Sequence, residues 1–252
     1  MPRFFVEPSA VRDGVVVLTG DNARHASYSL RLAVGDIVTV CDQTLAYTCR
    51  LSHFNGAEIT AEILSSHPAD TEPPYRAILF QALPKGDKLD TVIQKAVELG
   101  AAEIVPFESA HCIMKSKPEA EDRKTERRQK IAEEAAKQSG RGIIPTVRRT
   151  ETNFAKVIAE AAACDLALFC YEGTGTCPLD VLLDLHFPRN AGAADTRPVI
   201  GVVIGSEGGF SPEEAEAARA AGLMMTGLGP RILRTETASG FVLSCLAFHS
   251  GL

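Results

Sequence analysis

One proline-rich segment divides this chain into two parts with different hydrophobic patterns, and this division constrains the fold more than any other feature. Up to about residue 64, short apolar runs and alternating apolar and polar positions are typical of strands. After residue 76, apolar runs of strand length alternate with segments of helical spacing. The segment between them, residues 65–75, is rich in proline and polar residues, as linkers between domains are. We therefore expect two domains, residues 1–72 and residues 73–252.

The first part predicts a small β-rich domain. Apolar runs at 15–18 and 37–40 have strand length, and apolar positions alternate with polar ones over 45–51 and 59–63. An Asn-Gly pair at 55–56 separates the last two runs, and this arrangement favours a hairpin. Several short strands in so few residues indicate a small barrel or sandwich.

The second part predicts an α/β domain. Strand-like runs lie at 77–83, 103–107, 144–147, 165–171, 198–204 and 224–228. Segments with helical spacing lie at 88–99, 121–139, 154–163, 178–185, 212–221 and 236–249. Strands and helices that alternate in this way favour a mostly parallel sheet covered by helices on both faces.

The composition is that of an ordinary globular chain. Its 252 residues are 45% hydrophobic and 23% charged, with a mean hydropathy of +0.02. No apolar run approaches the roughly 18 residues of a membrane span, and the N-terminus lacks the pattern of a secretory signal. The seven cysteines contain no C-x-x-C pair, so the sequence has no zinc motif. We expect a cytoplasmic protein without a membrane partner or a metal site.

The distribution of charge gives a mixed indication about nucleic acid. A net charge of −6 argues against a surface that is basic throughout. Residues 115–149 nevertheless contain 11 Lys and Arg against 6 Asp and Glu. A solvated helix face is the simpler explanation for such a mixed run.

A glycine-rich loop between a buried strand and a helix is the first candidate ligand site. Three glycines follow the strand at 202–204, and Ser211, Pro212 and Glu214 fit the cap and first turn of a helix. Glycines let a ligand approach the backbone, and open α/β sheets bind ligands at the carboxyl ends of their strands. The alternative is a tight turn that needs glycine only for its geometry. The loop matches neither the dinucleotide-binding nor the P-loop motif, nor a serine-hydrolase elbow.

Two further strand ends carry basic residues. Arg231 and Arg234 follow a Gly-Pro turn, and arginines in such a place suit the recognition of phosphate or carboxylate. The alternative is a pair of surface arginines on either side of two buried aliphatic residues. Lys85 and Lys88 follow another strand, where RNA phosphates and plain solvent are equally good explanations for them.

Several long segments of the sequence, taken in order, match the motifs of one known family. They are MPRFFV at 1–6, His25 with Leu30-Arg31 and Gly35-Asp36, KGDKLDTVIQKAVELG at 85–100, EAAKQSGR at 134–141, IGSEGGFSPEE at 204–214 and LGPRILRTETA at 228–238. The chain strongly resembles the bacterial small-subunit ribosomal RNA methyltransferases that methylate a uridine at ring N3, within the SPOUT superfamily. The resemblance covers almost the whole chain, and several long motifs in order are far more specific than one glycine loop.

The resemblance implies a fold, a reaction and partners. The fold class would be α/β, with a knotted SPOUT methyltransferase domain at 73–252 after a PUA-like β-barrel RNA-binding domain at 1–72. The cofactor would be S-adenosyl-L-methionine. The substrate would be a specific uridine of 16S ribosomal RNA, within the small ribosomal subunit. The chain would form a homodimer with its final helix in the interface.

The resemblance also assigns residues. Arg234 and Glu207 would act near the target base. RNA contacts are implied for Arg31 and Arg141, and the basic residues Arg3, His25, Lys85 and Lys88 are further candidates. The residues expected to bind the cofactor are Phe169, Tyr171, Glu172, Ile204, Gly205, Gly208, Gly209, Leu228, Gly229, Ile232, Leu233 and Thr235.

Two departures from the family pattern and two alternatives stay open. Ser206 stands where the family usually has proline, and we expect the loop to survive because the glycines around it remain. His111 stands where the family usually has arginine, so less positive charge is expected there at neutral pH. The alternatives are a SPOUT methyltransferase that acts on another RNA or atom, such as a ribose 2′-oxygen, and a non-catalytic RNA-binding protein of ribosome assembly.

Overall fold

The structure, a computed structural model, describes residues 1–187 and 197–251. The chain divides into two compact units. The first consists of Met1–Glu72 and Ala136–Ile144, and the second of Pro73–Ala135 and Pro145–Leu252. Residues 136–144 therefore belong with the first unit, whereas the sequence analysis placed them in the middle of the α/β domain.

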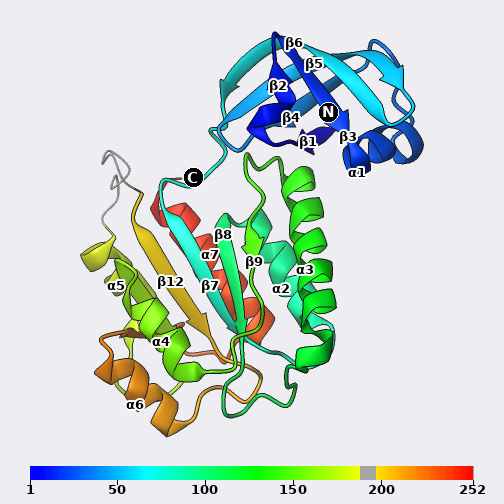
Figure 1. The fold of residues 1–252 in the computed structure, drawn as a ribbon. Helices are drawn as coiled ribbons and strands as arrows, with labels where there is room; N and C mark the ends of the chain where they lie inside the picture. Colours follow the sequence, from blue (N-terminus) through cyan, green and yellow to red (C-terminus); the bar gives the residue numbers. More distant parts are fainter. Residues whose placement is uncertain (188–196, 252) are drawn as a thin grey trace. The chain divides into compact units, whose positions relative to one another are not determined.

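The second unit is built around a parallel sheet (Figure 1). Within the described residues its strands, in spatial order, are β11 (Cys177–Pro178), β13 (Met224–Gly227), β10 (Leu166–Cys170), β12 (Val199–Ile204), β7 (Arg76–Ala82), β8 (Ala101–Phe107) and β9 (Thr146–Val147). Every neighbouring pair among them is parallel. The central strands are almost entirely apolar and buried, as strands covered on both faces are. The predicted parallel sheet is confirmed.

Helices cover both faces of this sheet. They are α2 (Lys88–Glu98), α3 (Pro118–Ser139), α4 (Phe154–Ala162), α5 (Leu179–His186), α6 (Pro212–Ala220) and α7 (Thr235–His249). Helices α2 and α7 pack on each other and contact β8, β7 and β12, whereas α4 and α6 contact each other and β10, β12 and β13. In Figure 1, α7 lies behind β12 and β7 while α4 lies in front of the sheet. No helix of the described chain is long and apolar enough to cross a membrane.

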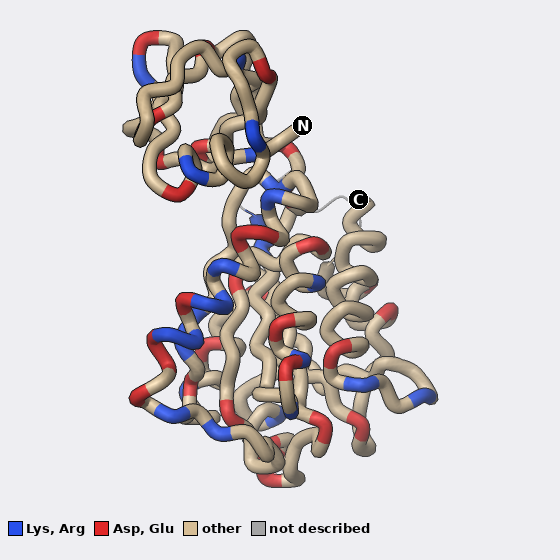
Figure 2. Tube along the Cα trace, turned by 90° about the vertical axis from the view of Figure 1, so that its right-hand side faces the viewer, with Lys and Arg blue, Asp and Glu red and all other residues tan. Residues whose placement is uncertain are grey.

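Helix α3 is the segment that the sequence analysis singled out for its charge. It faces the viewer in Figure 2, where Lys and Arg positions recur on this side of the unit among Asp and Glu positions. Several of these charges are paired, and the Arg128–Glu121 ion pair has a buried Glu121 side chain and an N–O distance of 3.1 Å. Residues up to Ala135 belong to the second unit, and the last turn of the helix belongs to the first.

The first unit contains an antiparallel sheet with one further strand that pairs in parallel along one edge. In the described part of the chain, its strands are β1 (Arg3–Phe5), β4 (Ile37–Cys41), β5 (Leu45–Asn55), β6 (Glu58–Pro68), β3 (Val15–Thr19) and β2 (Val11–Arg12), in this spatial order. Only β1 with β4 is parallel among these pairs. A short helix α1 (Gly20–Arg24) continues directly into a π-helical turn at His25–Ser29.

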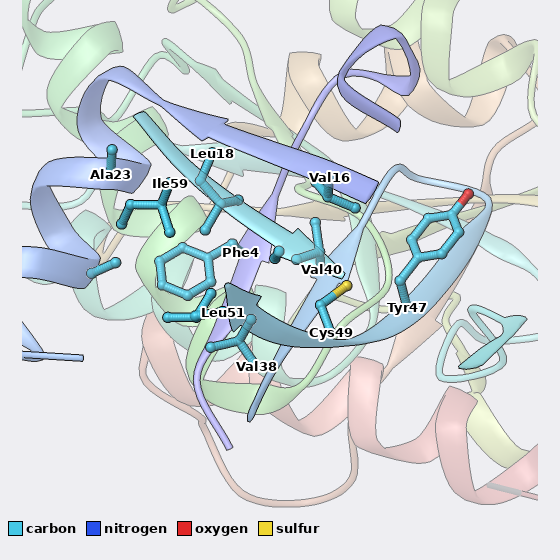
Figure 3. Close-up of a cluster of buried hydrophobic side chains, with 12 residues drawn as sticks. Phe4, Val16, Leu18, Ala23, Val38, Val40, Tyr47, Cys49, Leu51 and Ile59 are labelled. Atoms are coloured by element: carbon cyan, nitrogen blue, oxygen red, sulfur yellow. The ribbon is translucent and has the colours of Figure 1, made fainter. Parts of the chain in front are cut away.

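The core of this unit follows from the alternation of side chains along its strands. Leu51 on β5 and Ile59 on β6 are at most 1% exposed, and they pack with Phe4 of β1 (Figure 3). Full burial of a large apolar side chain contributes about 1.5–3 kcal/mol. Phe4 lies far from Leu51 and Ile59 in sequence. This core therefore joins the start of the segment Met1–Glu72 to its later strands.

The hairpin prediction is confirmed, but the linker prediction is partly wrong. Asn55 pairs with Glu58 across the turn, and Gly56 has a φ of +55°, which glycine adopts without strain. Strand β6, however, continues to Pro68, which pairs with Leu45. Residues 65–68 are thus part of a strand because β5 is long enough to pair with them.

Candidate functional site

The carboxyl ends of three adjacent strands, β13, β10 and β12, lie side by side because the strands are parallel. The loops after them enclose a cavity of about 770 Å³. Its lining comes from segments that start at residues 170, 204 and 227, together with Ala238. The predicted cofactor residues that line it are Tyr171, Glu172, Ile204, Gly205, Gly208, Gly209, Leu228, Gly229, Ile232, Leu233 and Thr235.

The glycine loop after β12 is fixed by the start of α6. The Oγ of Ser211 accepts the N–H of Glu214 at 3.2 Å, and a Glu214 oxygen accepts the N–H of Ser211 at 2.9 Å. This is the predicted capping box. The other oxygen of Glu214 accepts the N–H of Ala110 at 2.7 Å, which ties the loop after β8 to the same helix start.

The two departures from the family pattern both lie at this loop. The carbonyl of Ser206 accepts the N–H of Gly209 at 3.0 Å, and Gly209 has a φ of +63°, so the turn closes without proline. The Nδ1 of His111 lies 2.8 Å from the carbonyl oxygen of Gly208. A Cβ on Gly208 would lie 2.8 Å from the Cβ of His111, closer than such atoms approach. His111 therefore packs against the glycine loop and helps to position it.

A buried glutamine that the sequence analysis missed joins the loop to helix α7. Gln81, at the end of β7, is 0% exposed, and its Nε2 donates to the Oγ1 of Thr235 at 2.8 Å. The Thr235 hydroxyl donates in turn to the carbonyl of Gly205 at 2.6 Å. Two walls of the cavity are thus held by one chain of hydrogen bonds. A polar residue within an otherwise apolar strand was the available signal for Gln81.

Arg234 lines the same cavity, and its side chain has no partner among the described residues. The residue is exposed, lines the cavity and makes no side-chain hydrogen bond or ion pair to the described residues. Its backbone carbonyl accepts the N–H groups of Thr237 and Ala238, both at 2.8 Å, so the backbone is fixed as the N-cap of α7. A fixed backbone with a free guanidinium suits an arginine that contacts a bound substrate.

Glu207 is already engaged by two groups of the neighbouring loop. Its carboxylate accepts the Nζ of Lys88 at 2.8 Å and the backbone N–H of Lys85 at 3.1 Å. Burial alone would raise the pKa of Glu207, but these hydrogen bonds and the charge of Lys88 outweigh it, and the pKa lies below its usual value. The hydrogen bond to Glu207 raises the pKa of Lys88. Both groups are therefore charged at neutral pH.

Comparison with known proteins agrees with this geometry. A family model described as an RNA methyltransferase domain matches residues 71–247. A ribosomal RNA small subunit methyltransferase E from Synechocystis is 30% identical over 96% of this chain and 76% of that protein. The chain belongs to this RNA methyltransferase family. The Bacillus subtilis protein of the same name is 29% identical to it over 100% of this chain and 98% of its own length.

A solved structure of the family has the same fold. It is a ribosomal RNA small subunit methyltransferase E from Neisseria gonorrhoeae, bound to S-adenosyl methionine. It is 30% identical to this chain, with a TM-score of 0.81, and the match covers 98% of this chain and 96% of that one.

One residue that the family resemblance assigned to the cofactor lies elsewhere. Phe169 is 0% exposed and does not line the cavity. Its ring packs on that of Phe210 with 4.2 Å between centroids, so it supports the glycine loop from within the core. In a strand, successive side chains point to opposite faces, and Phe169 lies on the face that packs against Phe210.

The basic residues assigned to RNA divide into two groups. The guanidinium of Arg3 donates to the carbonyl of Arg141 at 2.8 Å, and Arg141 is 3% exposed and bound to Glu72. These two arginines hold the first unit together, and the described geometry does not present Arg141 to RNA. The residues Arg31 and Lys85 are exposed, His25 is half-buried, and Lys88 is bound to Glu207. The structure describes no group of three or more His, Cys, Asp and Glu suited to a metal ion among the placed residues.

Proposed function

We propose that this chain uses S-adenosyl-L-methionine to methylate N3 of a specific uridine in 16S ribosomal RNA. The observation that carries the proposal is the exposed guanidinium of Arg234, which has no partner among the described residues and lines a cavity formed by three strand-end loops. Membership of the RNA methyltransferase family and the names of the relatives support the substrate. The cofactor reported in the Neisseria gonorrhoeae structure supports the identity of the small molecule.

The residues around the cavity fit this cofactor. A volume of about 770 Å³ is in the range of cavities that bind small molecules and cofactors. The glycines of the lining let the ligand reach backbone N–H and C=O groups, which suits its amino acid and nucleoside parts. Ser206 lines the cavity, and its Oγ is buried without a hydrogen-bond partner among the described residues. When bound there, the cofactor supplies a methyl group on a sulfonium.

The chain's own residues would prepare the uracil. Uracil N3 carries a proton and becomes a good nucleophile only after losing it, which leaves negative charge shared with the ring carbonyls. The guanidinium of Arg234 would stabilise that charge. Because N3 lies on the pairing edge, the base must be unpaired or turned out of its helix before it can enter. The main task of the protein is to hold the reacting atoms close and aligned.

Glu207 has a positioning role in this proposal. Its carboxylate is ionised and bound by Lys88 and the backbone of Lys85, so it anchors the loop beside the cavity. The N3 proton would then leave to solvent or to a group of the RNA.

The finer features of the resemblance belong to the same proposal. Residues 1–72 would form a PUA-like barrel that helps to hold RNA, and residues 73–252 a SPOUT domain with a trefoil knot. The chain would act as a homodimer in the cytoplasm, on RNA within the small ribosomal subunit. Phe241 and Phe248 on α7 are 41% and 75% exposed, which supports a dimer interface on that helix.

The cofactor site has a direct test in thermal unfolding. A ligand present at about 100 times its Kd adds about 2.7 kcal/mol to the folded state, which for a unit of this size raises Tm by about 5–10 °C. We expect S-adenosyl-L-methionine to give such a shift. In Gly208→Ala the shift should fall to less than half, since the new Cβ would collide with His111.

Gly240→Ala is the matched control. Gly240 lies within α7, and a Cβ there would make only an ordinary contact, at 3.8 Å from Leu99. Its cofactor shift should equal that of the parent protein. Absence of any shift in the parent protein would favour a non-catalytic RNA-binding protein. A normal shift together with methylation of a ribose oxygen would keep the cofactor site but replace the proposed target atom.

A further inference from the structure

A second cavity of about 640 Å³ lies between the loop before α2 and the first half of α3. One wall consists of Leu83, Pro84, Gly86, Asp87, Leu89 and Asp90, and the other of residues of α3 together with residues 114–116. The lining residues on α3 are Glu121, Arg123, Lys124, Glu126, Arg127, Arg128 and Lys130. We call this cavity the α3 groove. All of its residues lie in the second unit.

The charges of the α3 groove are only partly compensated. Arg127 is paired with Asp90, and Arg128 with Glu121. Among the described residues, the side chains of Arg123, Lys124 and Lys130 have no hydrogen-bond or ion-pair partner, whereas the unpaired carboxylates of the lining are Asp87 and Glu126. Lys115 adds another cation, with its partner Glu108 outside the lining. The groove therefore carries an excess of positive charge in a chain whose net charge is −6.

The spacing of the cations on α3 suits a chain of anions. The free cations Arg123 and Lys130 lie on one face of the helix, with Arg127, which is paired with Asp90, between them. Neighbours in this row are four and three residues apart, about 5–6 Å. Met114, which is 40% exposed, lines the same groove and offers an apolar contact beside the cations. A positively charged groove that follows the backbone is a feature of proteins that bind a single nucleic-acid strand.

The groove adjoins the candidate cofactor cavity through two contacts. The loop 83–88, of which Leu83, Pro84, Gly86 and Asp87 line the groove, binds Glu207 of the cavity through its other two members, Lys85 and Lys88. The segment after β8 reaches the cavity through His111 and Gly208 and reaches the groove through Met114. The same two segments therefore contact both the groove and the cofactor cavity, so the two sites adjoin.

We propose that the α3 groove binds the phosphates of a single-stranded RNA segment next to the target uridine, with Arg123, Lys124 and Lys130 as the main contacts. This inference rests on the proposed function, because the RNA is the substrate named there. It gives the charged face of α3 a role beyond solvation. It also accounts for RNA binding by a chain with a negative net charge, since the positive charge is concentrated where the strand lies.

The test compares two variants with the same loss of charge. R123Q/K124Q/K130Q removes the free cations of the groove, whereas K95Q/K156Q/R219Q removes three exposed cations of the same unit outside it. Binding of a 16S ribosomal RNA transcript is measured over a range of salt concentrations. Each lost phosphate contact with a single strand lowers the slope of log K against log salt by about 0.7. We expect the groove variant to lose about 2 from this slope and to bind on the order of ten-fold or more weakly.

Further measurements make the outcomes decisive. The S-adenosyl-L-methionine shift in Tm should be unchanged in both variants, which separates lost RNA contacts from misfolding. R123K/K124R/K130R keeps the charges and should restore the salt slope.

Equal binding by the groove variant and the control variant, with a parent protein that methylates RNA, would overturn the inference alone. Weaker activity only on assembled subunits, with unchanged binding to the transcript, would assign the groove to a ribosomal protein and also overturn it. A parent protein that neither binds nor methylates RNA would remove the proposed function and this inference together.

Discussion

Replacing Arg234 with alanine is expected to slow methyl transfer by about a hundred- to a thousand-fold in kcat, the usual effect of removing one group that stabilises transition-state charge. The Arg234 side chain makes no hydrogen bond or ion pair to the described residues, and its backbone caps α7 without using the side chain. The substitution should therefore leave the cavity and the affinity for S-adenosyl-L-methionine nearly unchanged. Single-turnover kinetics with labelled cofactor, together with a titration of cofactor binding, measure the two effects separately.

Two variants serve as controls for this result. Arg231→Ala removes an equal charge from the same loop and should reduce kcat far less, because the proposal gives Arg231 no contact with the uracil. Arg234→Lys keeps a cation with a different shape and should recover part of the rate. A kcat of R234A within about ten-fold of the parent value would exclude Arg234 from charge stabilisation.

Replacing Glu72 with alanine is expected to destabilise the first unit by about 3–5 kcal/mol, the cost of breaking a buried ion pair on one side. The side chains of Glu72 and Arg141 are 5% and 4% exposed, and the carboxylate also accepts the N–H of Gly142 at 3.0 Å. Alanine would leave the guanidinium of Arg141 buried without this counter-charge. Urea unfolding followed by circular dichroism on the full chain measures the loss of stability.

An exposed ion pair gives the matched comparison. Lys95 and Glu98 lie on the surface of α2, and Glu98→Ala should cost about 0.5 kcal/mol or less. In the double variant E72A/R141L the total loss should be smaller than the sum of the two single losses, because neither member of the Glu72–Arg141 pair remains buried without the other. An E72A variant as stable as E98A would contradict the role given to this pair.

The parts of the fold that the sequence predicted are those with local signals. Strand β12 is a continuous apolar run, Ser211 and Glu214 stand at capping-box spacing, and the Asn-Gly pair at 55–56 stands between two alternating runs. Each of these signals is contained within about a dozen residues, so the pattern alone determines the local structure.

The parts that were missed depend on contacts between distant residues. Arg141 and Glu72 are 69 positions apart, and nothing near Arg141 indicates that its charge is buried. The polar end of β6 has the composition of a linker, and it forms a strand because it pairs with β5. Both features concern the segments that complete the first unit.

The loops that line the cavity carry local signals, whereas the residues that support them do not. Glycine-rich loops that follow strands can be recognised in the sequence. Parallel strands place their carboxyl ends together, so these loops are expected to meet. The family resemblance assigned Phe169 to the cofactor, and in the structure its ring packs on Phe210 within the core. Gln81 was overlooked because a lone glutamine in an apolar strand does not reveal that Thr235 is its partner.

The most direct test of the central proposal is the identity of the methylated nucleoside. The protein would be incubated with labelled S-adenosyl-L-methionine and small ribosomal subunits from cells that lack the gene, and the RNA digested and analysed by mass spectrometry. The account predicts one labelled product, N3-methyluridine, at a single position of 16S ribosomal RNA. A different methylated nucleoside, or no transfer to subunits, naked ribosomal RNA or transfer RNA, would contradict it.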